Sequence, residues 1–257
     1  MDPSHHPNVI DASSFDALLD AYPSTVSSKL DELEKARLET IPAALEQRKS
    51  SDAYLEKSEV QTLVDWKLSH GTFRPSLKKL VASNSEEAVE TTTKAAYGLY
   101  AEDKANHGKA LKELATLRGI GPATASLLLS VYDPATIPFF SDELYRWIAW
   151  DSEAKGKGKG WERKIGYTAK EYEALYGGVE KLRESLEKNG RVTTALECEK
   201  VAYVLGRNKD EIPSMKEEER VDRKVDEKKG EREASGKELD DEAEEEEKPA
   251  RKRRRKG

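Results

Sequence analysis

The segment Leu117–Ala125, which reads Leu-Arg-Gly-Ile-Gly-Pro-Ala-Thr-Ala, constrains the fold more than any other stretch of this 257-residue chain. Two glycines flank one aliphatic residue between two stretches whose apolar residues recur at helical spacing. Because Gly119 and Gly121 have no Cβ and tolerate positive φ, they predict a tight turn between two helices. Pro122 fits the first position of the second helix, where its missing N–H costs nothing. The sequence therefore predicts a helix-hairpin-helix over about residues 109–132.

A turn of this kind places backbone N–H groups at the N-terminus of the second helix, where the helix dipole also favours negative charge. The hairpin therefore indicates a phosphate contact and, with it, nucleic acid. About twenty residues downstream, Pro-Phe-Phe precedes Ser141 and Asp142, where a third helix is expected to start. Asp142 is a candidate functional carboxylate. The alternative is that Ser141 or Asp142 only caps the helix, since both residue types are preferred there.

By composition the chain divides into a body and a highly charged tail. Residues 207–257 contain 17 basic and 18 acidic residues and very few large apolar ones, so burial cannot offset their chain entropy. We predict one folded domain over 1–205 and a disordered tail over 206–257. The body keeps 27 basic and 32 acidic residues, which argues against a protein that mainly coats nucleic acid.

A basic cluster within residues 248–256 of the tail is typical of a nuclear import signal, a nucleic-acid-binding patch, or both, and we favour nuclear import. Its members are Lys248, Arg251, Lys252, Arg253, Arg254, Arg255 and Lys256. We therefore expect a nuclear protein whose tail also meets nuclear protein partners. A generic charged terminus is the alternative, because the preceding acidic run, residues 240–247, would partly neutralise the cluster.

The cysteine and histidine content and the hydropathy of the sequence argue against several kinds of site and against a membrane span. Cys198 is the only cysteine, which excludes an internal disulfide and an iron–sulfur cluster held by this chain alone. The histidines show no metal-ligand spacing beyond the adjacent His5 and His6, so no metal site is predicted. No apolar stretch approaches the ~20 residues that a membrane span needs. We expect a soluble monomer with no membrane partner.

Local signals are helical almost throughout the body. Ser58, Thr168 and Thr194 are each followed three positions later by Gln or Glu, the pattern of a capping box, and Ser85 precedes two glutamates. Alternating apolar strands are missing from the sequence, and so are Asn-Gly hairpin turns between two such strands. We therefore predict an all-α fold.

The order of these features resembles that in the HhH-GPD superfamily of base-excision DNA glycosylases. In both, the hairpin glycines are followed by a helix and then by an acidic residue at the start of the next helix. With Asp65-Trp66-Lys67-Leu68 and Gly71-Thr72-Phe73-Arg74-Pro75, the sequence is most similar to the Amun-like branch of eukaryotic nuclear proteins. The motif match covers about residues 105–150, and the wider similarity extends over most of the body. The resemblance implies a two-lobed helical fold that binds double-stranded DNA.

The resemblance also implies roles for single residues. In the family the hairpin amides hold the backbone of the lesion strand, often with a metal ion, and an aspartate beyond the second helix faces the flipped nucleotide. The aspartate matches Asp142 as the catalytic residue. The expected DNA-backbone contacts are Gly119, Ile120, Gly121 and Thr124. A monovalent cation at the hairpin is the one cofactor that stays open.

One departure from the family restricts the chemistry. Bifunctional members carry a lysine two residues after the second glycine, which forms a Schiff base and cleaves the strand, whereas this chain has Ala123 there. We therefore expect simple hydrolysis of the N-glycosidic bond without strand cleavage. Asp142 would have to be ionised, either to stabilise positive charge developing on the deoxyribose or to activate a water.

A glycosylase also needs aromatic or apolar faces around an extruded base. The candidates for such a base pocket are Trp66, Tyr97, Tyr100 and Tyr145. The alternative is that these side chains belong to the core, as aromatics at helical spacing usually do. The candidate phosphate contacts are Arg74, Lys78 and Arg118.

Three functions therefore compete. The first is a nuclear, monofunctional DNA-glycosylase-like protein of base-excision repair, which the presence of Asp142 favours. The second is a non-catalytic helix-hairpin-helix protein that binds DNA or chromatin, which the acidic body favours. The third is a module for protein interactions in which the hairpin serves packing alone.

Overall fold

Helices make up the regular structure of the residues that the computed structural model describes, which are 1–49, 52–71, 75–153 and 157–207. These residues contain no strand, and the prediction of an all-α fold is confirmed. They all belong to one unit, which spans Met1–Asp210. None of the described helices is long and apolar enough to cross a membrane. The basic cluster predicted as an import signal lies outside the described residues.

The helices are short, and most are joined by turns of a few residues. Their bounds are α1 (Ala12–Asp20), α2 (Tyr22–Thr25), α3 (Asp31–Lys35), α4 (Ile41–Arg48), α5 (Lys57–His70), α6 (Pro75–Ala82), α7 (Glu86–Glu102), α8 (His107–Leu114), α9 (Pro122–Ser130), α10 (Asp142–Ile148), α11 (Ala169–Lys188) and α12 (Ala195–Arg207). Short 3-10 turns lie at Pro3–His5, Ser28–Leu30, Lys104–Asn106 and Gly160–Glu162, and a π-turn, η3, at Ala36–Thr40.

Side-chain caps fix most of the helix starts that the sequence predicts. Ser85 caps α7 by accepting from the N–H of Ala88, and Thr168 caps α11 in a reciprocal capping box with Glu171. Thr194 opens α12 in the same reciprocal way. The prediction that Ser58 caps α5 is wrong. The reciprocal bonds there join Glu56 and Glu59, so the helix starts at Lys57, one residue before Ser58.

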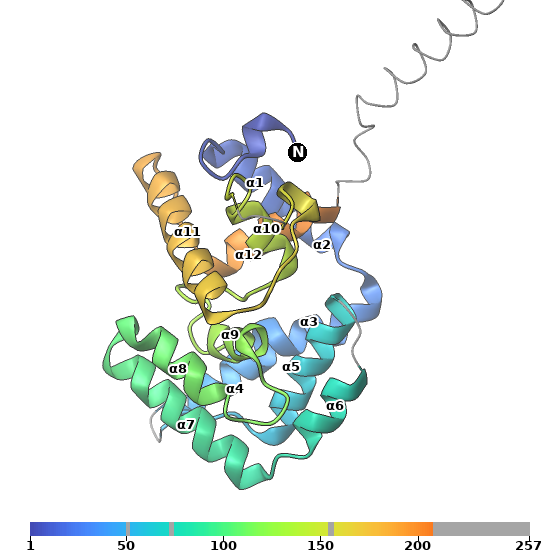
Figure 1. Ribbon diagram of the computed structural model, residues 1–257, viewed down its shortest axis with the longest axis vertical. Helices are drawn as coiled ribbons and strands as arrows, with labels where there is room; N and C mark the ends of the chain where they lie inside the picture. Colours follow the sequence, from blue (N-terminus) through green and yellow to red (C-terminus); the bar gives the residue numbers. More distant parts are fainter. Residues whose placement is uncertain (50–51, 72–74, 154–156, 208–257) are drawn as a thin grey trace, which may run out of the picture. The chain divides into compact units, whose positions relative to one another are not determined.

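The helices form two groups whose members come from separate parts of the sequence (Figure 1). Helices α1, α2, α10 and α11 pack against α12, so the start and the end of the described chain lie together. In the other group, α5 contacts α3, α6, α7 and α9, and α8 packs between α7 and α9. A single large cluster of buried apolar side chains extends through both groups. The resemblance to the HhH-GPD fold remains an expectation at this level.

A π-turn joins α3 to α4. The N–H of Ile41 donates to the carbonyl of Ala36, five residues back, and Pro42 follows at the start of α4. Because Pro42 has no N–H, a continuous α-helical ladder is interrupted here in any case, and the wider turn absorbs the interruption. The turn carries Arg37 on its inner side, where its side chain is 2% exposed.

Arg37 and Glu199 form a buried ion pair between the π-turn and α12. Two hydrogen bonds join the guanidinium to the carboxylate, at 2.7 and 2.5 Å. The guanidinium also lies 3.8 Å from the ring centre of Trp66 and 5.4 Å from that of Phe139. This one charged group therefore connects helices of both groups, and its pair to Glu199 is oriented by both hydrogen bonds.

Replacing Arg37 with Met tests this pair. Glu199 would then remain buried without its countercharge, so we expect the free energy of unfolding to fall by about 3–5 kcal/mol. The double variant Arg37→Met with Glu199→Leu removes both charges and should recover most of that loss. Urea unfolding of the full chain measures both values. Equal destabilisation in the single and double variants would contradict a dominant role for the unpaired charge.

Candidate functional site

The turn between α8 and α9 is built around Gly119. Its φ is +81°, and a Cβ there would lie 2.9 Å from the Cβ of Leu80 and 3.2 Å from the backbone nitrogen of Val81. Glycine is therefore needed both for the backbone conformation and for the close approach of α6. Asn84 fixes the same turn, because its side chain accepts from the N–H of Arg118 and donates to the carbonyl of Arg118.

Neither the backbone conformation nor a close contact explains the glycine at position 121. Its φ of −100° is open to any residue, and a Cβ built on it would meet nothing within 4 Å. Both glycines tolerate positive φ, and the turn uses that freedom at Gly119 but not at Gly121. Gly121 precedes α9, whose N-terminus has no side-chain cap. The bare backbone at Gly121 thus leaves the start of this helix open to whatever approaches from outside.

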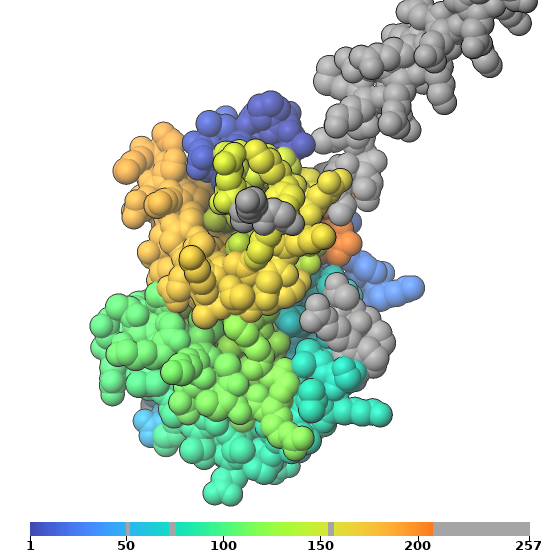
Figure 2. All heavy atoms as spheres, viewed as in Figure 1, coloured from blue at the N-terminus to red at the C-terminus, as the bar shows by residue number. Residues whose placement is uncertain are grey.

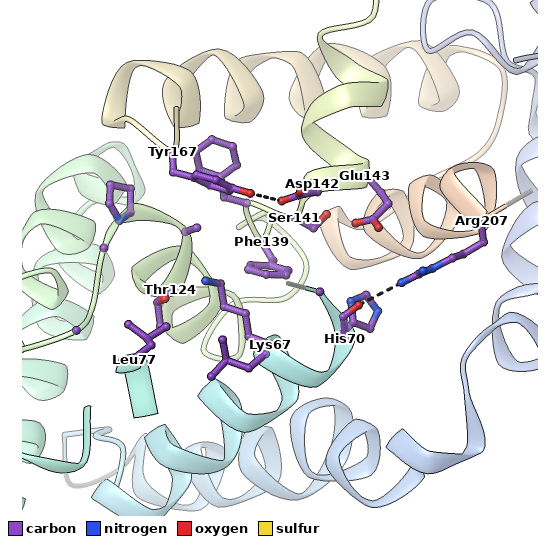
Figure 3. A pocket seen from close by; sticks show the side chains of 17 residues that line it. Lys67, His70, Leu77, Thr124, Phe139, Ser141, Asp142, Glu143, Tyr167 and Arg207 are labelled. Carbon is purple, nitrogen blue, oxygen red and sulfur yellow. Dashed lines mark hydrogen bonds between the residues drawn. The ribbon is translucent and has the colours of Figure 1, made fainter. Parts of the chain in front are cut away.

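A cleft of about 480 Å³ opens next to this turn (Figure 3). Figure 2 shows the side of the molecule on which the green residues of the α8–α9 region adjoin the yellow segment that follows α10. The volume falls in the range of small-molecule sites in proteins. The residues that line the cleft are Lys67, Leu68, His70, Gly71, Leu77, Gly119, Gly121, Pro122, Ala123, Thr124, Phe139, Phe140, Ser141, Asp142, Glu143, Tyr167 and Arg207.

Asp142 is the first residue of α10, and its carboxylate is not used as the helix cap. The hydroxyl of Ser141 accepts from the N–H of Leu144 instead, at 3.2 Å. Of the two possibilities that the sequence leaves open, Ser141 is therefore the cap. The Asp142 carboxylate is 32% exposed at the cleft and lies 3.2 Å from the guanidinium of Arg146. That cation stabilises negative charge on Asp142.

Tyr167 holds the other oxygen of the same carboxylate. Its hydroxyl donates to Oδ1 of Asp142 at 2.6 Å, and its ring centre lies 5.6 Å from that of Phe140 (Figure 3). The φ of Tyr167 is +52°, a conformation that costs a non-glycine residue of order 1 kcal/mol. The surrounding structure therefore maintains backbone strain at the residue that orients Asp142.

Basic side chains also line the cleft. Lys67 extends from α5 into the cleft, and Arg207 reaches it from the end of α12 (Figure 3). Arg207 donates to the carbonyl of His70 at 3.2 Å and lies over the ring of Tyr203. The cleft therefore combines two cations with two acidic residues, Asp142 and Glu143, instead of carrying one sign of charge.

His70 is a buried neutral side chain in the wall of the cleft. Its ring lies between those of Trp66 and Tyr203, at 4.5 and 4.3 Å between ring centres, and it is 6% exposed. Burial, with the nearby cations Arg37 and Arg207, lowers the pKa of His70 to about 3. Its Nε2 has no hydrogen-bond partner among the described residues. His70 is therefore uncharged at neutral pH.

The aromatic residues predicted to form a base pocket belong to the core, and none of them lines this cleft. Trp66 is fully buried under Arg37, and its indole N–H donates to Glu34. The hydroxyls of Tyr97 and Tyr100 donate to Leu128 and Asp133. Tyr145 is 5% exposed. The physical reason is helical periodicity: one face of each helix is buried, and the large aromatics lie on it. Phe139, Phe140 and Tyr167 line the cleft instead.

The other predicted contacts are spread around the hairpin. Gly119, Gly121 and Thr124 line the cleft together with Asp142, whereas Ile120 is buried in the core. Arg118 is exposed on the turn, and its side chain is not part of the cleft lining. Lys78 forms an ion pair with Asp65 at 2.8 Å, outside the cleft lining. Arg74 lies outside the described residues.

Several cleft residues carry no signal in the sequence that marks them as functional. Glu143 is an exception, because its place next to Asp142 in the sequence already points to the same site. Tyr167 and Arg207 come from segments 25 and 65 positions away from Asp142 and reach the cleft only through the packing of α11 and α12 on α10. Among the described residues, no group of three or more His, Cys, Asp or Glu side chains is arranged to hold a metal ion.

Comparison with known proteins gives no assignment. No family model matches the chain, and neither a curated protein nor a solved structure does.

Substituting the two hairpin glycines separates their roles. Gly119→Ala should lower the free energy of unfolding by about 1–3 kcal/mol, because it adds strain at positive φ. Gly121→Ala should change it by less than about 0.5 kcal/mol, because the new methyl group meets open space. Thermal and urea unfolding measure both. A loss at Gly121 as large as that at Gly119 would contradict the assignment of Gly121 as an open position.

The neutral state of His70 predicts how stability depends on pH. The unfolded chain binds a proton at His70 below pH ~6.5, and the folded chain does so only near pH 3, so acid favours unfolding. Between pH 7.5 and 5.5 this contributes a loss of about 1.4 kcal/mol. His70→Phe keeps an aromatic ring between Trp66 and Tyr203 and should remove that part of the pH dependence. Urea unfolding at the two pH values, compared with the parent, provides the test.

Proposed function

We propose that this protein is a monofunctional DNA glycosylase of base-excision repair, with the helical architecture of the HhH-GPD superfamily. In this proposal, double-stranded DNA binds across the hairpin, and one flipped nucleotide enters the cleft beside Asp142. The enzyme then hydrolyses the N-glycosidic bond of that nucleotide. The basic cluster of the tail would direct the protein to the nucleus.

One observation carries the proposal: Asp142 and Gly121 face the same cleft, and neither is needed there by the fold. Ser141 already caps α10, so the Asp142 carboxylate is not needed as a cap. Among the residues that the structure describes, none lies within 4 Å of a Cβ on Gly121, so no steric contact with them requires glycine there. Two such residues in one cavity favour a ligand with both a phosphate and a reacting centre.

The distribution of charge in the cleft suits the sugar-phosphate backbone of DNA. The open N-terminus of α9 and the side chains of Lys67 and Arg207 provide positive potential for phosphates. Asp142, held by Arg146 and Tyr167, lies where negative charge would stabilise an electron-deficient deoxyribose or accept a proton from water. The ring of Phe139 and that of Tyr167 offer flat faces for a base.

The residue at position 123 limits the reaction to hydrolysis. Ala123 occupies the place of the lysine that forms a Schiff base in bifunctional members of the resembled family. The proposal therefore includes release of the base and excludes a covalent intermediate at this position. An abasic site in an intact strand is the expected product.

A second function has one specific observation in its favour. The body of the chain carries more acidic than basic residues, which weakens non-specific attraction to DNA. A helix-hairpin-helix protein that binds DNA or chromatin without catalysis is therefore the alternative. It predicts binding through Gly121 without any release of a base.

The test uses the full chain and a panel of duplexes with single damaged or mismatched bases. Asp142→Asn should reduce base release by at least about 100-fold and change DNA affinity by less than about threefold, because it removes charge without removing shape. Gly121→Glu should weaken DNA binding in a salt-dependent assay, because it adds bulk and negative charge where a phosphate is expected.

Asp31→Asn is a matched control, since Asp31 is also the first residue of a helix but is exposed and is not one of the residues that line the cleft. It should leave both base release and binding unchanged. DNA binding without base release by the parent chain on every duplex would replace the first function with the second.

A further inference from the structure

Glu143 is the one acidic side chain of the cleft lining that has no part in the proposal so far. It is the second residue of α10, next to Asp142, and half-buried at the cleft. Figure 3 shows it on the side of the cleft where Arg207 and His70 lie. Among the described residues it forms no ion pair within 4 Å, in contrast to Asp142.

The fold makes room for this carboxyl group. A Cβ on Gly206 of α12 would lie 2.6 Å from Cγ of Glu143 and 3.3 Å from its Cβ, so the side chain lies directly against a glycine. The same point on Gly206 is 3.6 Å from the ring of Trp161. The Cβ and Cγ of Glu143 therefore lie against the backbone of α12, near a point that the ring of Trp161 also borders.

The neighbouring carboxyl groups of Asp142 and Glu143 lie in different surroundings. Burial raises the pKa of Glu143, and the negative charge of Asp142 raises it further, although Arg207 and Arg146 act in the opposite direction. Tyr203, on α12, is the other titratable group that interacts with it. Asp142 has a guanidinium and a hydroxyl against its oxygens instead. The two carboxyl groups therefore differ in their contacts: Asp142 faces a cation and a hydroxyl donor, whereas Glu143 lies against the backbone of α12.

We propose that Glu143 is a second catalytic residue, which donates a proton to the departing base while Asp142 acts on the sugar. This inference rests on the proposed function and identifies a class of substrate for it. A neutral base leaves poorly as an anion, so a proton donor in the cleft is useful only for neutral bases. The cleft is therefore built for an uncharged base, and not for one that already carries positive charge.

The C1′–N bond breaks, its electron pair stays with the base, and the proton of the Glu143 carboxyl group passes to the base. Water adds to C1′ and gives its proton to the Asp142 carboxylate. The products are the neutral base and an abasic sugar with a hydroxyl at C1′. A proton exchanged through solvent from Asp142 to Glu143 restores both groups.

The decisive experiment compares duplexes that contain a neutral leaving base with a duplex that contains 7-methylguanine, which is cationic and leaves without a proton. The neutral probes are uracil, hypoxanthine and mismatched adenine. Glu143→Gln should slow release of the neutral base by about 100-fold or more, the usual scale of general acid catalysis, and leave any release of 7-methylguanine within about twofold. Asp142→Asn should slow both.

The pH profile provides a readout that a structural role would not move. With a neutral base, the rate for the parent chain should fall as pH rises through the pKa of Glu143, because the donor loses its proton. Glu143→Gln should lose that limb of the profile. Glu87→Gln is the matched control, since Glu87 is the second residue of α7 and exposed, and its profile should equal that of the parent.

The outcomes separate this inference from the function on which it rests. If the parent releases a neutral base and Glu143→Gln keeps that activity and its pH profile, Glu143 is not the donor and the glycosylase proposal stands. If the parent releases only 7-methylguanine, the inference fails in the same way. If the parent releases no base from any probe while it binds the duplexes, the proposed function fails, and the inference fails with it.

Discussion

The pair between Arg37 and Glu199 is the interaction on which the arrangement of the helices depends. A guanidinium and a carboxylate, both almost fully buried, are stable together only if each stays in contact with the other. Arg37 comes from the π-turn beside α3 and Glu199 from α12, so the two groups of helices cannot separate without exposing or orphaning a charge. The same guanidinium lies over Trp66 and Phe139, and Phe139 is a wall of the cleft. The position of that wall is therefore tied to a charge pair on the far side of the ring.

The cleft itself depends on residues that contribute conformation more than chemistry. Gly119 allows α6 to approach the hairpin, and Gly206 allows α10 to carry Glu143 against α12. Ser141 takes over the cap of α10 and leaves Asp142 with Tyr167 and Arg146 as its partners. The backbone of Tyr167 itself is strained, with positive φ, where its side chain contacts Asp142. Such strain and unneeded polar groups destabilise a fold, and they are typical of positions that serve a ligand.

The parts of the structure that could be predicted from the sequence are those set by near neighbours. The caps at Ser85, Thr168 and Thr194 involve residues three positions apart, and the hairpin is set by Gly119 within its own turn. The cap of α5 was mispredicted because Glu at position 56 replaced the expected hydroxyl residue.

Contacts between residues far apart in the sequence could not be predicted. Arg37 meets Glu199 across 162 positions and Arg207 meets His70 across 137, and no local pattern encodes such pairings. The aromatic residues were candidates for a base pocket, and the alternative that helical spacing favours, burial in the core, is what the structure shows.

The π-turn has a consequence for how this chain tolerates changes in length. A turn of this type holds one residue more than an α-helical turn, and each residue of a helix rotates the following side chains by about 100°. Deleting a single residue within Ala36–Thr40 would therefore not merely shorten a helix. It would swing either Arg37 or the whole of α4 around the helix axis, and the buried charge would lose its carboxylate. Surface loops of the body can vary in length, whereas the number of residues in this one turn is fixed by an electrostatic partner on the last described helix.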